Sequence, residues 1–308
     1  MSTTHTPTII AACDGGDRGR QAVVLGRILA EATGAHLLIA AVYPHPGLPF
    51  PPPIAHHEDA RRTTDRAIRG VRDELAPGAR TVVVPGLSPA HALCKLAEER
   101  HASMLVVGSR HAQKGRHMAD ADHALQVLRS AHTAVLVAPD DRPVSGGVRR
   151  ILVGFDDGDG SHDAVGFALE LGRATGAEVR LLSVVPQEAQ AWWITGAAPV
   201  DPGDLEGWVR TRREALGAAA AETLEEAGDV TTSFEVVSGS AIGELLAAAA
   251  ESDLLVLGSR RWGRIARIAL GSIAEPIVRR TPCPTLIVPR RHGAATTEEP
   301  RLTTSARG

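Results

Sequence analysis

Short apolar runs alternate along the chain with longer segments in which apolar residues recur at helical spacing. The runs are typical of buried strands, and the helical spacing is typical of amphipathic helices. In the first half these patterns predict strands at residues 8–13, 36–43, 80–84, 104–107 and 133–137, and helices at 18–33, 58–75, 89–100 and 123–131. The run 36–43 is almost entirely apolar, as expected for a strand buried on both faces of a parallel sheet. The alternation of strands and helices predicts an α/β fold with right-handed crossovers.

The pattern starts again in the second half of the chain. When Asp14 is placed over Asp156, an offset of 142 residues (156 − 14), residues 8–44 align with residues 150–186 without a gap. Of these 37 aligned positions, 13 are identical. An agreement of this length favours an internal duplication of one α/β unit.

Gly108 lies over Gly258 at an offset of 150 residues (258 − 108), so the second copy has the longer middle part. The repeat is much longer than a solenoid unit and therefore predicts two tandem domains. We place the domains at residues 1–140 and 149–290, with a polar linker rich in proline and glycine between them. Residues 291–308 are polar, and we expect them to form a flexible tail.

Residues 254–288 combine a strand, a glycine-containing loop, a short helix and a second strand. The first strand ends at Gly258, and Gly271-Ser272 opens a helix predicted over residues 273–280. A strand that leads through a glycine turn to a helix start leaves unpaired backbone N–H groups facing one point, and the helix dipole adds positive charge there. Such a place can bind phosphate. The alternative is an ordinary connection between a strand and a helix.

This stretch resembles the nucleotide loop of the universal stress protein family, which has glycine, two residues, glycine, nine residues and then Gly-Ser or Gly-Thr. Here the order is Gly258, two residues, Arg261, nine residues and Gly271-Ser272, so the spacing is kept and the second glycine is not. The resemblance covers nearly all of residues 8–139 and 149–289. It implies two tandem doubly wound α/β domains, each a five-stranded parallel sheet in the order 3-2-1-4-5 with flanking helices. In that order strands 1 and 4 are neighbours, and a ligand crevice opens at their carboxyl ends.

The resemblance implies that the second domain binds ATP, with Mg²⁺ carried on the phosphates. Asp156 would contact the adenine and Val184 would flank the base. The ribose and phosphate positions would be taken by Gly258, Gly271 and Ser272. Arg261 could block the approach of the backbone to the ligand, or its side chain could add positive charge beside the phosphates. We expect nucleotide binding to be retained in this domain.

The first domain keeps only part of this arrangement. Asp14, Val42 and Gly108 match the base-binding half, but Ala121-Asp122 replaces the Gly-Ser pair and His111 stands where the second domain has Arg261. A carboxylate beside a phosphate position repels the ligand. We therefore expect the first domain to bind nucleotide weakly or not at all.

Composition excludes several other classes. The net charge is −3, the pI is about 6.5 and aromatic residues are only 3%, which disfavours nucleic acid as a partner. Cys13, Cys94 and Cys283 lie far apart, as expected in a reducing compartment without a cysteine metal site. His56-His57-Glu58 lacks further ligands, so we expect no metal held by the protein alone. Neither a leader peptide nor a membrane-length apolar run is evident, which predicts a cytoplasmic protein without a membrane partner.

The leading hypothesis is an ATP-binding universal stress protein, a nucleotide-dependent regulatory module that acts on an unidentified protein partner in the stress response. A slow ATPase or phosphotransfer enzyme is one alternative, and a nucleotide-free interaction scaffold is another. The loop offers no evident general base, so we expect no catalytic residue and at most weak ATPase activity. In this family fifth strands commonly pair across a two-fold axis. Here residues 133–137 and 285–288 could pair within the chain as an internal pseudo-dimer, with further homodimerisation through other surfaces.

Overall fold

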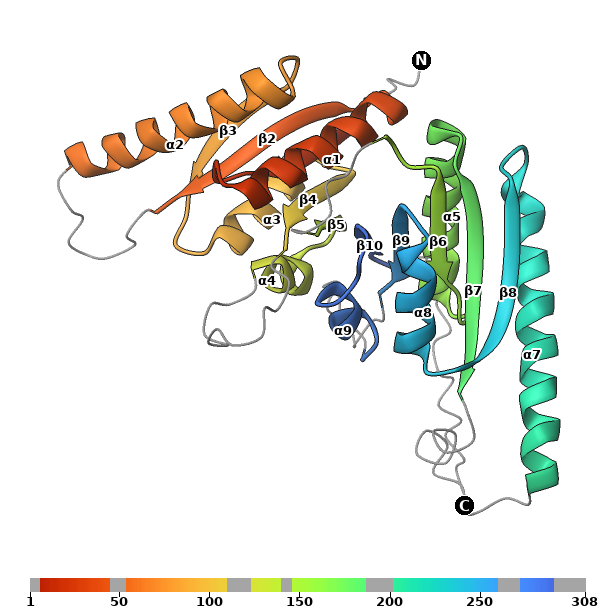
Figure 1. Cartoon of the computed structure of the whole chain (residues 1–308). Helices are drawn as coiled ribbons and strands as arrows, with labels where there is room; N and C mark the ends of the chain where they lie inside the picture. The colour runs from red at the N-terminus through yellow and green to blue at the C-terminus, as the bar shows by residue number, and fades with distance from the viewer. Residues whose placement is uncertain are drawn as a thin grey trace, which may run out of the picture.

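The computed structural model describes residues 6–44, 54–109, 123–139, 146–186, 202–259 and 272–290, and it does not describe the side chains of residues 54–57 and 202–205. Within these ranges strands and helices alternate through both halves of the chain (Figure 1). The first half contains β1 (Thr8–Ala12), α1 (Asp17–Thr33), β2 (His36–Tyr43), α2 (Ile54–Leu75), β3 (Arg80–Pro85), α3 (Pro89–Glu99), β4 (Met104–Gly108), α4 (His123–Ser130) and β5 (Ala134–Ala138).

The second half repeats this order with a longer helix after its second strand. It contains β6 (Arg150–Gly154), α5 (Asp159–Thr175), β7 (Glu178–Pro186), α7 (Pro202–Leu224), the short 3-10 helix η1 (Glu225–Ala227), β8 (Thr232–Gly239), α8 (Ala241–Ala250), β9 (Leu254–Gly258), α9 (Ala274–Val278) and β10 (Thr285–Val288). The helix expected over residues 273–280 is therefore shorter, because its flanking residues form turns.

The described strands form one ten-stranded sheet in the order β3-β2-β1-β4-β5-β10-β9-β6-β7-β8. Each half has the expected order 3-2-1-4-5, and all strand pairs within a half are parallel. The halves meet where β5 and β10 pair antiparallel, with Leu136 opposite Leu286. The predicted fold class and the internal pairing of the two fifth strands are both confirmed.

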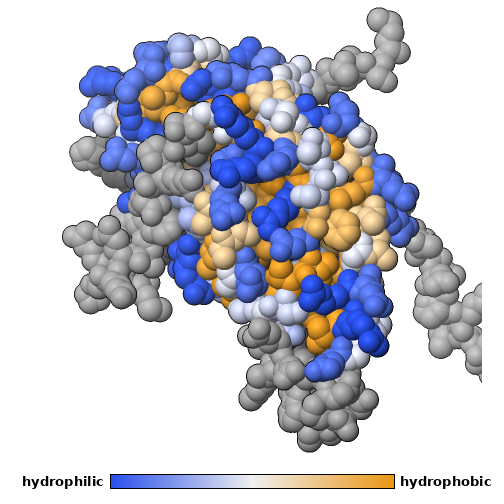
Figure 2. Space-filling model, turned by 45° about the vertical axis from the view of Figure 1, so that its right-hand side comes forward, coloured by the Kyte–Doolittle hydropathy of each residue, from blue (hydrophilic) through white to orange (hydrophobic). Residues whose placement is uncertain are grey.

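Helices cover both faces of this sheet, and the apolar core continues from one domain into the other on each face. One core cluster joins residues of α1, α2, α5 and α7 to one set of strand side chains, and the other joins α3, α4, α8 and α9 to the alternate set. This division follows from the strand period of two, since neighbouring residues such as Ile9 and Ile10 point to opposite faces. Figure 2 shows that apolar residues also reach part of the surface, where polar residues surround them.

The two copies of the helix after the first strand end in the same way. α1 stops at Gly34 and α5 stops at Gly176, and these glycines have φ values of 69° and 71°. Their N–H groups bind the carbonyls of Ala30 and Gly172. Glycine adopts this left-handed conformation without steric penalty, so it ends both helices and turns the chain into the second strand.

Candidate functional site

The strands that end at the candidate residues of the second domain are neighbours. β6 lies between β9 and β7, parallel to both, with Val153 opposite Val256. Asp156 follows the end of β6, and Gly258 is the last residue of β9. Val184 lies near the end of β7, half-buried against the core on the α8 side. These three residues therefore lie at the carboxyl edge of the sheet, where the crossovers separate to opposite faces and where doubly wound domains bind ligands.

The first domain has the same arrangement at its own carboxyl edge. β1 lies between β4 and β2, parallel to both. Asp14 follows β1, Gly108 ends β4, and Val42 lies near the end of β2, half-buried against the same core cluster as Val184. The residues predicted to form the base-binding half of the site are thus arranged alike in both copies.

Each aspartate is held by a tight turn of its own backbone. The Oδ1 atom of Asp156 accepts a hydrogen bond from the N–H of Gly158 at 3.1 Å, and that of Asp14 accepts one from Gly16 at 2.9 Å. Both aspartates are exposed. Because one carboxylate oxygen is fixed by the turn, the side chain has a defined direction at the sheet edge, and a carboxylate can accept a hydrogen bond from an N–H group of a ligand.

The glycines at the ends of β4 and β9 are explained by helix contact. A Cβ atom at Gly258 would lie 1.9 Å from the carbonyl oxygen of Gly160, and one at Gly108 would lie 2.6 Å from that of Arg18. Gly160 and Arg18 occupy the same position in the first turns of α5 and α1. The sequence predicted that these glycines let backbone approach a ligand, whereas the structure shows that close approach of a helix already requires them.

Arg290 lies beside this edge in the second domain, although sequence reasoning did not include it. Its guanidinium forms an ion pair with Asp159 in the first turn of α5. Its backbone N–H donates to the buried Ser259 hydroxyl at 3.3 Å. The repeat offered one signal for this contact, because its two partners Asp159 and Ser259 are matched by Asp17 and Ser109 in the first domain. That Arg290 reaches α5 follows only from the strand order, which places β10 beside β9.

Several predicted site residues cannot be placed. Arg261, Gly271 and the arginines around them lie outside the described residues, as do His111 and the Ala121-Asp122 pair of the first domain. Ser272 is described, and it is exposed in the turn before α9. The phosphate half of the predicted site therefore stays a prediction.

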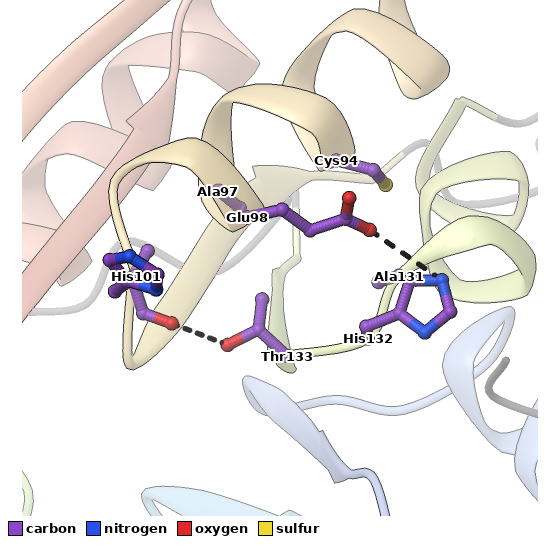
Figure 3. A pocket seen from close by; sticks show the side chains of 8 residues that line it. Cys94, Ala97, Glu98, His101, Ala131, His132 and Thr133 are labelled. Carbon is purple, nitrogen blue, oxygen red and sulfur yellow. Dashed lines mark hydrogen bonds and ion pairs between the residues drawn. The ribbon is translucent and has the colours of Figure 1, made fainter. Parts of the chain in front are cut away.

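Two cavities are found among the described residues, and none of the candidate residues lines either of them, although Val288 in the wall of the second pairs with Gly258. One, of about 400 Å³, opens where α3 ends near the start of β5 (Figure 3). Its walls include Glu98 and His132, whose side chains point toward one another with 3.5 Å between His132 Nε2 and Glu98 Oε1. The other, of about 480 Å³, lies between the start of β1 and α5 of the other domain. Both are at the amino ends of the first domain's strands, opposite its predicted site.

The cysteines are structural. All three are buried and none forms a disulfide. Burial, together with the nearby Glu98 carboxylate, raises the pKa of the Cys94 thiol to about 11, and burial also raises the pKa of Cys13. A thiol with a raised pKa carries little of the reactive thiolate at neutral pH, so Cys13 and Cys94 act as small apolar side chains.

An ion pair joins the two domains beside the central strands. Arg129 of α4 donates to Glu275 of α9 at 2.7 Å, and Arg279 reaches the same carboxylate at 3.2 Å. These contacts, that of Arg129 first, lower the pKa of Glu275. Because α4 and α9 follow the two predicted phosphate loops, this pair links the segments that border both loops.

No helix in the described ranges combines the length and the apolar content needed to cross a membrane. In the same ranges no group of three or more His, Cys, Asp or Glu side chains is arranged to hold a metal ion. The side chains of His56 and His57 are not described, so the sequence interpretation of that pair stays a prediction.

Two doubly wound α/β domains in tandem, each with an acidic turn after its first strand and a glycine at the end of its fourth, define the class of this protein. The family model described as the universal stress protein family matches residues 6–139 and 147–289, and the chain belongs to that family.

Similarity to individual proteins agrees with this assignment. Universal stress protein Rv2319c of Mycobacterium tuberculosis is 27% identical over 202 residues, which are 64% of this chain and 68% of that protein. Universal stress protein Rv2623 of the same species is 30% identical over 146 residues, or 45% and 46% of the two chains. The solved structure of a universal stress protein from Archaeoglobus fulgidus has a TM-score of 0.65 at 20% identity and covers 92% of this chain and 98% of its own. At that identity the likeness concerns the fold.

Proposed function

We propose that this chain is a nucleotide-dependent regulatory module whose second domain binds ATP at the carboxyl edge of β6 and β9. The observation that carries the proposal is that Asp156, Val184 and Gly258 come together from three adjacent strands at the switch point of the sheet. The chain's membership of the universal stress protein family supports the assignment. Asp156 would accept a hydrogen bond from the adenine edge, and Val184 would supply an apolar wall for the base.

The phosphates of this ligand would lie toward residues 259–272. The stretch includes Arg260, Arg261, Arg264 and Arg267. Their guanidinium groups suit phosphate oxygens, and Mg²⁺ would accompany the polyphosphate. A bound polyphosphate adds negative charge beside a strongly basic stretch, so occupancy changes the electrostatic surface that this edge offers to a protein partner. That change is the physical basis we propose for regulation.

The first domain would serve mainly as the structural partner of the second. It retains Asp14 and Val42, but Asp122 stands where the second domain has a serine hydroxyl. A fixed negative charge at a phosphate position opposes binding of ATP. We therefore propose one strong nucleotide site per chain.

Matched aspartate variants of the two copies test this proposal. We expect isothermal titration of the full chain with ATP and Mg²⁺ to show one site. Asp156→Ala should weaken binding by about tenfold or more, as expected when a hydrogen bond to the base is lost, whereas Asp14→Ala should leave that site unchanged. The proposal is wrong if the wild-type chain binds no ATP, or if both variants bind as the wild type does. Mass spectrometry of small molecules released from the freshly purified, denatured protein would identify the nucleotide independently.

A further inference from the structure

His162 joins two parts of the second domain that meet beside the candidate site. It lies in the first turn of α5, and its Nε2 atom is 3.1 Å from Oδ1 of Asp157, in the loop that follows β6. Its Nδ1 atom is 3.3 Å from the hydroxyl oxygen of Thr223 on α7. The buried Phe155 ring packs edge-on against the imidazole, with ring centroids 5.2 Å apart. The imidazole is thus held on three sides.

Counting hydrogens on these groups shows which form of the imidazole fits. The Thr223 hydroxyl donates its single hydrogen to the carbonyl of Ala219 at 2.7 Å, so toward His162 it can only accept. The ionised Asp157 carboxylate also only accepts. With the Thr223 hydroxyl oriented in this way, both contacts are satisfied together only when each ring nitrogen carries a hydrogen, and only the doubly protonated, positively charged imidazolium has two N–H groups. Deprotonation removes one of the two hydrogen bonds and the charge attraction to Asp157.

Asp157 is important because it adjoins the proposed adenine ligand Asp156. Its φ of 63° lies in the left-handed region, and the first domain has Gly15 there, with a φ of 92°. A residue with a side chain adopts this conformation less readily than glycine and keeps it where surrounding contacts hold it. The bond from His162 holds it, and Arg212 of α7 donates to the Asp156 carbonyl at 3.3 Å. The loop that presents the Asp156 carboxylate is thereby fixed from α5 and from α7.

In the first domain the corresponding position links the same two helices through a group that stays charged. Arg20 occupies the position of His162 in the repeat, at the same offset of 142 residues (162 − 20). It pairs with Glu74 of α2, the helix that corresponds to α7. An arginine side chain does not lose its proton in proteins, whereas a histidine changes charge near neutral pH. The link between these two helices is therefore carried by a permanently charged side chain in the first domain and by a histidine in the second.

We propose that His162 is a positioning residue that makes nucleotide binding by the second domain dependent on pH, with the tighter binding on the acidic side. This inference rests on the proposed nucleotide site. Besides Asp157, the charged residues that adjoin these contacts along the chain or pair with them include Asp159 and Asp163 of α5, Arg212 and Glu222 of α7, and Arg290 after β10. Of the two cationic residues among them, Arg290 is paired with Asp159 and Arg212 is bound to the Asp156 carbonyl.

The repeat itself supplies the test variant, His162→Arg, which installs the residue of the first domain. We expect the dissociation constant of the wild-type full chain for ATP and Mg²⁺ to rise about five- to tenfold between about pH 6 and about pH 8. A change of this size is expected from the loss of one hydrogen bond and of the imidazolium charge. For His162→Arg this change of about five- to tenfold in the dissociation constant between the two pH values should be absent. The variant also corrects for titration of ATP itself, which affects both proteins equally. Thr223→Val, which removes the acceptor for Nδ1–H at nearly constant shape, should flatten the profile as well and serves if the arginine variant does not fold.

Two measurements separate the failure of this inference from the failure of the proposed function. If wild type and variants bind ATP with the same pH profile, the positioning role of His162 is wrong and the nucleotide site stands. If the wild type binds no ATP at any pH, the proposed function is wrong, and the imidazole is then read directly by ¹H–¹⁵N NMR. The positioning role of His162 would be supported if both its ring nitrogens are protonated at about pH 6 and the amide resonances of Asp156 and Asp157 shift as one proton is lost. A single protonated nitrogen at that pH would overturn it.

Discussion

Replacing Gly258 by alanine tests whether this glycine serves the contact between β9 and α5 or the approach of a ligand. An ideal Cβ atom would lie 1.9 Å from the Gly160 carbonyl oxygen and 2.2 Å from its carbon, whereas ordinary contact begins at 3.4 Å. The first turn of α5 would have to move away by about 1.5 Å (3.4 − 1.9). Backbone cannot turn aside as a flexible side chain does, and this turn is fixed by the N–H of Ser161 bound to the Gly158 carbonyl at 2.8 Å.

The magnitude follows from this geometry. Inserting a methyl group into a closely packed site costs about 1–3 kcal/mol, and a clash between backbone groups belongs at the upper end. We therefore expect Gly258→Ala to lose about 3 kcal/mol of unfolding free energy, which lowers the melting temperature of a domain of this size by roughly 10 °C. Thermal melting followed by circular dichroism without nucleotide measures the effect, because a role of Gly258 in ligand approach does not contribute when no ligand is present.

Two further glycines calibrate this result. Gly166 lies within α5 with no atom within 4 Å of its Cβ position, so Gly166→Ala should stabilise by about 0.5–1 kcal/mol. Gly108→Ala should destabilise less than Gly258→Ala, since its nearest contact would be 2.6 Å. The packing explanation would be refuted if Gly258→Ala melted within about 2 °C of the wild type and only lost nucleotide binding.

Three further predictions concern the phosphate position of the first domain, the ion pair between Arg129 and Glu275, and the buried Cys94. The double change Ala121→Gly, Asp122→Ser should raise the ATP affinity of the first domain in titration calorimetry, and no gain would contradict the electrostatic explanation of its weakness. Arg129→Ala should lower unfolding free energy by up to about 1 kcal/mol near neutral pH. The difference in unfolding free energy between variant and wild type should shrink as pH falls. The reason is that the Glu275 carboxyl, whose pKa is lowered in the folded state, stabilises the protein only while it is ionised. Urea unfolding at several pH values measures this difference. Cys94 should resist alkylation in the native protein and react after unfolding, as measured by mass spectrometry, since burial raises its pKa to about 11.

The fold was predictable because the same order of strand and helix patterns occurs in both halves of the sequence. Apolar runs marked the strands, and the alignment of the two copies places Gly34 over Gly176, the residues that end the corresponding helices in the structure. The offset between Asp14 and Asp156 then aligned the copies before any strand order was known. The strand order and the pairing of β5 with β10 came from family resemblance rather than from the residues, since no local pattern specifies which strands become neighbours.

The candidate site was predictable where residues follow strands and not where they meet across space. Asp156 and Gly258 were found because Asp156 closely follows a strand and Gly258 ends one. The contact of Gly258 with Gly160 could not be read from sequence, because it depends on how α5 crosses β9. His162 has no motif of its own, and its importance appears only when α7 brings Thr223 beside it. Arg129 and Glu275 are 146 residues apart, and the antiparallel meeting of β5 and β10 makes them neighbours.

The antiparallel seam between β5 and β10 also bears on how the two halves can evolve. In a dimer of identical subunits, every substitution falls on both subunits at once, so a change that damages one ligand edge damages its twin. Here the two partners of the seam are encoded separately and are always present in equal number, because one polypeptide carries both. One half can therefore lose its phosphate loop and keep only its shape, while the other half retains the chemistry.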